Sequence, residues 1–483
     1  MASEIRVNKI ENRSGLGTVT FADTGVDLAG IVTATTFSGS GASLTALPAA
    51  QLSGALPALD GSALTGVAST DNIRTNTDAT FLKGVNVSGV TTVGSAVTIS
   101  ESGIEASGIG ITVANINGTQ IGGRRNIIIN GAMNVAQRGT SSTSNGYQTV
   151  DRFNVEYSGT DETPTQAQVD VASGTTPYTE GLRKALKITN GNQTGGSGAG
   201  DYVQIYNRPE AQDLASSGWN HKSSSSFITL SFWIKSSVAQ AFSGSLRTSD
   251  GTSYSYKFDT PSLSADTWTK VIKTVPGNSN LTINNDNGVG IQVLIYPFLG
   301  TTYTTSNSDT ETWVIGGNNY ANDMTTTWYI TNDATFEITG VQLEVGSQAT
   351  PFEHRSMGDE LLLCQRYYFR LGKQDYLGTH MAAGEIYGIG MSDNDNENIY
   401  AMINFPVRMR QPPTAVDQSG SAGDYRVRRD TSKTCTGVPT FVDAAEHYCR
   451  VNFPSSSHGW GTGQMLWCQS AGSSGYLGFS AEL

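Results

Sequence analysis

Aromatic residues are distributed very unevenly along this chain of 483 residues. They are nearly absent before residue 124 and reach ordinary globular density after it, beginning with RRNIIINGAMNVAQRGTSSTSNGYQTVDRF (Arg124–Phe153). Aromatic rings supply a large part of the area that a globular core buries. The first quarter of the chain therefore lacks the material for an ordinary core, and the sequence predicts a thin N-terminal stalk joined to a packed head.

The N-terminal part is repetitive. Residues 1–41 carry short apolar runs broken by Gly, which predict two or three short strands. In the Leu/Pro/Ala-rich residues 42–70, Ala46-Leu47-Pro48-Ala49 recurs as Ala55-Leu56-Pro57-Ala58. Residues 71–123 carry Val and Ile punctuated by Gly, a pattern typical of a β-spiral or β-helical stem.

Neither repeat can bury its apolar side chains within a single chain. We therefore expect several copies to wind around a common axis, which makes this part an oligomeric stalk. A disordered linker is the alternative, although regularly spaced Leu residues are unusual in a solvated tether.

The composition favours strands over helices. Charged residues make up 15% of the chain and hydrophobic residues 37%, while Gly alone numbers 55. Thr suits pleated surfaces, and Gly and Asn supply turn positions with positive φ, so we expect an all-β fold. The net charge of −12 disfavours nucleic acid as a partner, because phosphate binding needs clustered Lys and Arg. No apolar run approaches the roughly 20 residues that span a bilayer, and we expect no membrane insertion and no signal peptide.

The chain has four cysteines, Cys364, Cys435, Cys449 and Cys468. They are too few and too widely spaced to stabilise a chain of this length by disulfide bonds. We expect mainly free, buried thiols, and a Cys435–Cys449 or Cys449–Cys468 pair stays open as an alternative. A zinc set that adds His447 is disfavoured, because no CxxC pair is present and the spacing fits no standard site. We expect no cofactor.

Residues 124–355 predict an antiparallel sandwich of jelly-roll type. The clearest strand is Phe227–Lys235, which is apolar on both faces, as expected inside a sandwich. Further strands are expected at residues 202–206, 254–258, 268–275, 290–298, 312–315, 327–330 and 335–345.

A short helical connector is expected over residues 356–370, because Ser356 and Asp359 resemble a capping box. Residues 371–483 again show strand and loop patterns, and they predict a C-terminal β-sandwich tip.

Three stretches resemble parts of the tail fibre proteins of tailed bacteriophages, most closely those of marine cyanobacterial phages. They are IRVNKIENRSGLGTVTFADTGVDLAGIVTATTFSGSG, NIIINGAMNVAQRGTS followed by VDRF, and FEITGVQLEVGSQATPFEHRSMGDELLLCQRYYFR, of which the last is the most specific. Residues 371–483 are only loosely similar, apart from the closing GFSAEL. The resemblance implies an elongated homotrimeric fibre with a carbohydrate-binding-like jelly-roll head. It also implies a place in the virion tail and assembly in the host cytoplasm.

We therefore expect a structural adhesin. Residues 1–41 would dock on a phage tail or adaptor protein, and residues 371–483 would bind a host-surface glycan or outer-membrane receptor. Two alternatives stay open, a tailspike that depolymerises glycans with paired carboxylates and a capsid decoration protein. We expect no enzyme, because the long central β-helix of such depolymerases does not fit after Gln120 and no GxSxG elbow is present.

Candidate receptor-binding residues are aromatic residues in Ser- and Gly-rich loops, because Trp and Tyr rings stack on the C–H faces of sugars. The sequence suggests Trp460 as a stacking platform, with His458 and Asn396 as hydrogen-bonding neighbours. Tyr476 and Trp219 are further candidates. The alternative for each ring is that it packs in the core or between subunits.

Carboxylates alternate at Asp393, Asp395 and Glu397, as in some calcium loops. The Gly and the distal Glu of an EF-hand are missing, so we expect a polar hairpin loop here and no metal site.

Overall fold

The computed structural model describes residues 6–11, 18–23, 25–29, 31–33, 35–36, 38, 125–305, 309–317, 320–372, 385–393, 397–456 and 458–483. The chain divides into two compact units, residues 1–104 and 105–483, which we describe separately. The repeat and stem predicted over residues 42–123 lie outside the described residues.

The first unit contains a small antiparallel sheet. Its strands are β1 (Lys9–Glu11), β2 (Thr18–Ala22) and β3 (Gly25–Ala29), in that order. Short strands were expected here. Val26 and Leu28 on β3 are 55% and 42% exposed. A sheet of this size with exposed apolar side chains is marginal in water.

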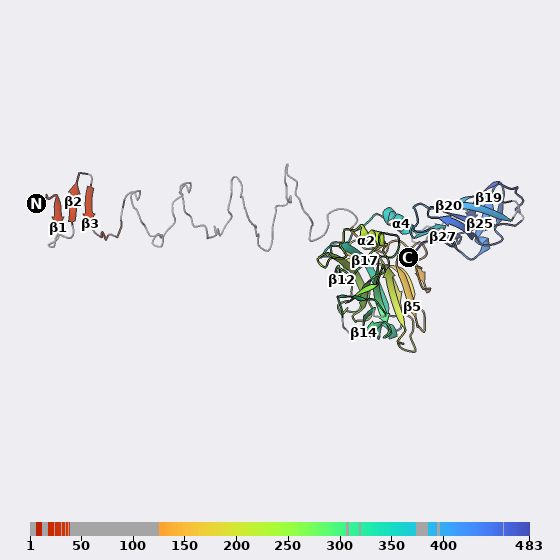
Figure 1. The fold of residues 1–483 in the computed structure, drawn as a ribbon, viewed down its shortest axis with the longest axis horizontal. Coiled ribbons are helices and arrows are strands. Elements are labelled where there is room, and N and C mark those ends of the chain that lie inside the picture. The colour runs from red at the N-terminus through yellow and green to blue at the C-terminus, as the bar shows by residue number, and fades with distance from the viewer. Residues whose placement is uncertain are drawn as a thin grey trace. The chain divides into compact units, whose positions relative to one another are not determined.

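Two six-stranded antiparallel sheets form the head (Figure 1). The first sheet has the order β15-β11-β10-β13-β8-β5. We call it the groove sheet, because its outer face carries the groove described below. Its strands are β5 (Asn154–Ser158), β8 (Tyr202–Asn207), β10 (Ser243–Thr248), β11 (Tyr254–Asp259), β13 (Ile291–Leu299) and β15 (Trp313–Ile315).

The second, which we call the opposite sheet, has the order β12-β9-β17-β7-β6-β4. Its strands are β4 (Ser141–Ser142), β6 (Thr165–Asp170), β7 (Lys184–Thr189), β9 (Phe227–Ser236), β12 (Thr269–Pro276) and β17 (Thr335–Val345). The two sheets confirm the expected all-β fold with a jelly-roll sandwich.

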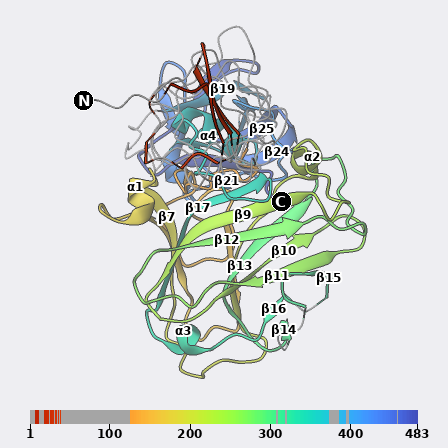
Figure 2. The same ribbon diagram turned by 90° about the vertical axis from the view of Figure 1, so that its left-hand side faces the viewer.

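Short elements complete the head. The helices are α1 (Thr176–Thr179), α2 (Ala211–Ala215) and α3 (Thr327–Ile330), and a parallel pair joins β14 (Thr304–Thr305) to β16 (Ala321–Asn322). Figure 2 shows α1 and α3 at the margins of the sandwich.

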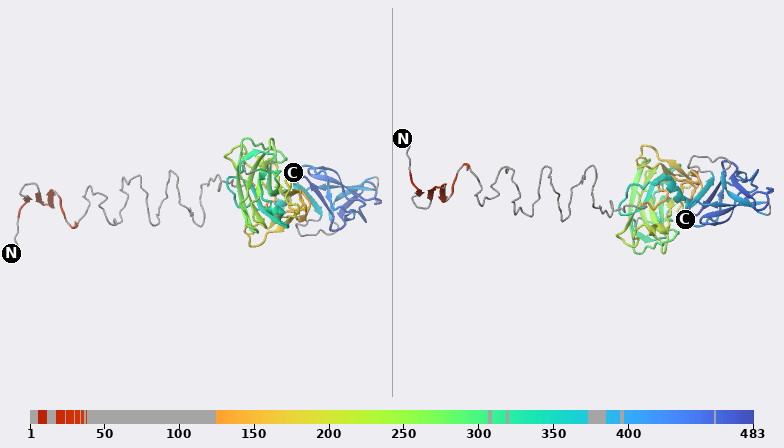
Figure 3. Two further views of the ribbon diagram at one scale, coloured as in Figure 1. Left: turned by 90° about the horizontal axis from the view of Figure 1, so that it is seen from below. Right: turned by 90° about the horizontal axis from the view of Figure 1, so that it is seen from above.

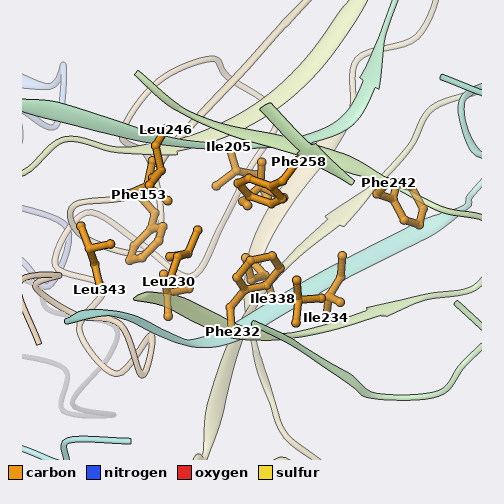
Figure 4. Close-up of a cluster of buried hydrophobic side chains, with 14 of the residues drawn as sticks. Phe153, Ile205, Leu230, Phe232, Ile234, Phe242, Leu246, Phe258, Ile338 and Leu343 are labelled. Atoms are coloured by element: carbon orange, nitrogen blue, oxygen red, sulfur yellow. The ribbon is translucent and has the colours of Figure 1, made fainter. Parts of the chain in front are cut away.

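The core of the head lies between the two sheets. Side chains alternate between the faces of a strand, so every second residue points inward. Ile205, Leu246 and Phe258 of the groove sheet face Phe232 and Ile338 of the opposite sheet (Figure 4). All five side chains are almost fully buried.

Most of the expected head strands are present, but one expectation is wrong. Residues 327–330 form the helix α3 and not a strand. Trp328 and Tyr329 are neighbours in sequence, and both are buried in the same core cluster. A strand would send them to opposite faces, whereas a helical turn lets both enter the core. The main-chain amide of Trp328 donates to Gln240 Oε1 at 2.9 Å, which stabilises this turn.

The first and last segments of the head meet in space, although they lie at opposite ends of its sequence. The main-chain amide of Ile127 donates to the carbonyl oxygen of Leu343 at 2.9 Å, and Asn126 Nδ2 donates to that of Val341 at 3.1 Å. The Glu353 carboxylate accepts the amide of Asn126 at 2.9 Å. These hydrogen bonds join the first residues of the head to β17 and to the segment that follows it. We call this set of contacts the latch.

The expected helix is α4 (Met357–Gln365), with Ser356 as its N-cap. Beyond it lie a three-stranded sheet of order β18-β27-β21 and a seven-stranded sheet of order β23-β22-β26-β19-β20-β25-β24. Their strands are β18 (Tyr368–Gly372), β19 (Ile386–Ser392), β20 (Asn398–Asn404), β21 (Asp417–Gln418), β22 (Tyr425–Arg428), β23 (Ser432–Thr434), β24 (Thr440–Ala445), β25 (Tyr448–Pro454), β26 (Met465–Ser470) and β27 (Tyr476–Ser480). A 3-10 turn, η4, spans Ala422–Asp424.

The cysteines behave as expected. All four are free and buried, and Cys435, Cys449 and Cys468 belong to the core of the C-terminal sheets.

The end of the chain returns to the head. Arg410 Nε donates to the carbonyl oxygen of Ala481 at 2.7 Å, and Arg410 Nη1 donates to that of Asn287 at 3.1 Å. The Arg152 guanidinium, which is buried, pairs with Glu482. The C-terminal strands therefore pack directly against the sandwich (Figure 3).

Candidate functional site

The outer face of the groove sheet is the best candidate site. On β8, Val203 and Ile205 point into the core, so Tyr202, Gln204 and Tyr206 point outward. β13 follows the same alternation and presents Gln292 and Leu294, while β10 presents Arg247.

These outward side chains line a groove of about 510 Å³. Its size is within the range of ligand-binding clefts. The lining residues are Tyr202, Gln204, Tyr206, Arg208, Arg247, Thr248, Ser249, Ser253, Gln292, Leu294, Leu299, Tyr303 and Tyr320.

Three half-buried tyrosines form an aromatic wall of the groove. The ring centres of Tyr202 and Tyr303 lie 5.5 Å apart at an interplanar angle of 88°, and those of Tyr303 and Tyr320 lie 6.0 Å apart at 64°. Such edge-to-face contacts hold the rings in fixed orientations. Burial raises the pKa of Tyr202, with a further contribution from the Glu156 carboxylate, so its hydroxyl stays protonated and can donate a hydrogen bond.

Two arginines supply the charge of the groove. The Arg208 guanidinium lies 4.0 Å from the ring centre of Tyr206, and the Arg247 guanidinium lies 4.6 Å from that of Tyr320. Arg247 Nε donates to Ser253 Oγ at 3.0 Å, which orients the guanidinium. Each arginine thus lies on a ring and keeps further N–H donors for a ligand.

A carboxylate beside the groove, on the same face of the neighbouring strand β5, fixes two of its polar side chains. Gln204 Nε2 donates to Glu156 Oε2 at 2.8 Å, and the Tyr206 hydroxyl donates to Glu156 Oε1 at 3.0 Å. Among the described residues, the lining itself includes no Asp or Glu. The groove therefore combines apolar ring faces, amides and positive charge, which suits a sugar that carries acidic groups.

The structure buries three of the five candidates from the sequence. Trp460 is 9% exposed and donates from Nε1 to Asp430 Oδ1 at 3.2 Å. His458 is 2% exposed, and its ring stacks on that of Trp460 with ring centres 5.4 Å apart. Trp219 is 4% exposed within the head core. Burial leaves these side chains little surface for a ligand, and their receptor-binding role stays a prediction.

Of the remaining two candidates, the structure describes only Tyr476. Tyr476 is half-buried on β27, with the Arg370 guanidinium 3.7 Å from its ring centre. Asn396 lies outside the described residues, as does Asp395 of the alternating carboxylates. Within the described ranges, no group of three or more His, Cys, Asp or Glu side chains is placed to hold a metal ion.

The sequence patterns alone do not reveal the groove, although they contain part of the signal. The alternation in Tyr202–Tyr206 predicted a strand, and the outward Tyr, Gln and Tyr follow from it directly. The groove also needs Arg247 from β10, a strand that was not predicted because SGSLRT has little apolar content. Tyr303 and Tyr320 come from loops, and only the fold brings them to β8.

No protein-family model matches the chain. No curated protein sequence is significantly similar to it. In the described part of the chain, no helix is long and apolar enough to cross a membrane.

Several solved structures resemble part of the chain. One is the enzymatically active domain of tailspike protein 4 from bacteriophage CBA120, with a TM-score of 0.25 and 10% identity over 46% of this chain and 21% of that one. Another is the family 11 carbohydrate-binding module of a cellulosomal cellulase from Clostridium thermocellum, with a TM-score of 0.20 and 14% identity over 45% of this chain and 98% of that one. A third holds carbohydrate-binding and catalytic modules of a Clostridium thermocellum xylanase with xylohexaose, with a TM-score of 0.21 and 10% identity over 46% of this chain and 30% of that one. These scores are too low to assign a function.

Proposed function

We propose that this protein is a glycan-binding adhesin, and that the groove on the outer face of the groove sheet holds the sugar. The observation that carries the proposal is the wall formed by Tyr202, Tyr303 and Tyr320 beside two arginines. Tyrosine faces stack on sugar rings, while the guanidinium groups and Gln204 bind hydroxyl and acidic groups. Because the charged lining is cationic, the preferred sugars carry carboxylate, sulfate or phosphate.

We further propose that the adhesin is a homotrimeric phage tail fibre. Support comes from the sequence stretches that resemble such fibres and from the uncovered apolar residues of the N-terminal strands. The fibre would attach to the tail through residues 1–41 and present the head and the C-terminal sheets to the host surface. Three weak sites on one fibre would give high avidity. Antibody labelling of purified virions tests this placement, and labelling of the capsid would favour a decoration protein.

The groove is tested by titrating the full chain with an acidic and a neutral polysaccharide, for example polygalacturonate and dextran. Tyr320→Ala removes a stacking face and should weaken binding of the acidic polymer roughly 5- to 100-fold, by analogy with bases that stack on aromatic side chains. Tyr178→Ala is a matched control, because Tyr178 is also half-buried with an arginine, Arg183, over its ring at 3.9 Å. Equal binding by both variants would contradict the assignment of the groove.

The tailspike alternative makes a different prediction, the release of reducing sugar from the bound polysaccharide. Glycoside hydrolysis requires paired carboxylates beside the scissile bond. The same incubation therefore separates a binding protein from a depolymerase.

A further inference from the structure

A second surface of the molecule carries exposed apolar side chains that the glycan groove does not explain. It is the outer face of the seven-stranded C-terminal sheet, on the central strands β26, β19 and β20. We call these residues the apolar face. They are Ile386 (48% exposed), Ile389 (52%), Met391 (55%), Tyr400 (37%), Met402 (54%), Met465 (63%) and Trp467 (44%).

The register of the strands makes the apolar face continuous. Met391 on β19 lies opposite Met465 on β26 and opposite Tyr400 on β20. Ile389 lies opposite Trp467 in the next outward-facing row. Directly opposed side chains in antiparallel strands are close enough to touch, so these residues form one patch.

The inner face of the same strands already forms a core. Ile399, Ala401, Leu466 and Cys468 are almost fully buried in the C-terminal cluster. An antiparallel sheet with one packed face normally presents polar residues on the other. At a rough 100 Å² per side chain the apolar face exposes on the order of 700 Å², which exceeds the largest patch of most monomers and is close to the ~800 Å² per partner of a stable interface.

Charged side chains flank the apolar face on both sides. Arg428 on β22 lies opposite Trp467 on one side. On the other side, Met402 lies opposite Arg450, which forms an ion pair with Asp443 on the edge strand β24. An apolar centre with a polar rim is the usual composition of an interface between proteins.

We propose that the apolar face packs against the same face of further copies of this chain around a common axis. The inference rests on the proposed homotrimer, and it assigns a surface to that assembly. The occupant that we propose is a copy of the same chain, because the stalk repeats are also expected to bury their apolar side chains between several copies. Once the stalks associate, the C-terminal sheets of those copies are held at high local concentration.

Cysteine cross-linking of the full chain tests the proposal. The four native thiols are buried, and burial raises the pKa of Cys435 and Cys449 to about 12, so they are poor partners for oxidation. Met391→Cys places a reactive thiol at the centre of the apolar face. Mild oxidation should then give covalent dimers at high yield. Ile330→Cys is the control, because Ile330 is 50% exposed on α3 of the head and should give no dimers.

Three results would overturn the inference, and they have different consequences for the proposed homotrimer. A trimer of the Met391→Cys chain that forms no disulfide would leave the homotrimer standing and remove this face from its contacts. A monomeric full chain in light scattering would contradict both the homotrimer and the contact through the apolar face. If Met402→Glu abolishes adsorption to host cells and Met391→Cys gives no dimers, the face binds a host receptor and not another copy.

Discussion

At the scale of single residues, Trp460 shows how burial changes a functional expectation. Its ring belongs to the C-terminal core, stacks on His458 and is hydrogen-bonded to Asp430. We expect Trp460→Ala to destabilise the protein by roughly 3 kcal/mol, because truncation of a buried aromatic residue leaves a cavity. Calorimetry should show a lower Tm for the C-terminal transition. The decrease in Tm should be smaller for Trp460→Phe. An unchanged Tm together with lost adsorption would instead support the stacking role expected from the sequence.

Asp151 gives a second residue-scale prediction, about pH. Burial raises the pKa of its carboxyl to about 6, above the usual value of 3.8. Between these values the folded protein holds a proton that the unfolded chain has released, so the contribution of Asp151 to stability falls as pH rises from about 4 to about 6.

Asp151→Asn should therefore flatten this pH dependence and add up to about 3 kcal/mol at pH 7. The new amide N–H can donate to Gln137 Oε1, a buried atom without a hydrogen-bond partner among the described residues, when that amide turns. The turn ends the bond from Gln137 Nε2 to the carbonyl oxygen of Tyr368 at 2.6 Å, so the gain in stability stays below this limit. Urea unfolding at pH 4, 5.5 and 7 measures the effect. An unchanged slope of stability with pH would show that Asp151 titrates normally.

At the scale of elements, α4 connects the latch of the head with the C-terminal sheets. Ser356 Oγ accepts the main-chain amide of Asp359 at 3.1 Å, and Cys364 packs with Ile129 and Tyr367. We expect Ser356→Ala to cost about 1 kcal/mol, because a helix N-terminus loses the acceptor for one of its free amides. Thermal unfolding measures the loss. Ser356→Asn keeps an acceptor and should behave like the original chain, and equal losses in both variants would contradict capping.

At the scale of the whole molecule, the proposed fibre separates attachment from assembly. Deletion of residues 1–41 should leave a soluble trimer with about three times the chain mass of 51.1 kDa, less the deleted part, because the stalk repeats and the apolar face remain. The truncated chain should no longer be incorporated into particles. Immunoblots of purified virions measure this, and particles that still carry the truncated chain would place the attachment elsewhere.

The sequence by itself determined the local properties of this protein. Apolar runs such as Phe227–Lys235 specified strands, here one that is buried on both faces. Low charge and abundant Gly specified an all-β chain, and the spacing of Ser356 and Asp359 specified a helix start. Each of these follows from interactions between residues that are close in sequence.

Only the tertiary structure decided which side chains share a surface. Burial of Trp460 and Trp219, the helical turn at Trp328 and the groove between Tyr202, Arg247 and Tyr320 all depend on packing between distant strands. Sequence patterns show that a strand has an apolar face, but they do not show which strand lies beside it. The strand order brings β8, β10 and β13 together at the groove and leaves the outer face of β19, β20 and β26 apolar and exposed.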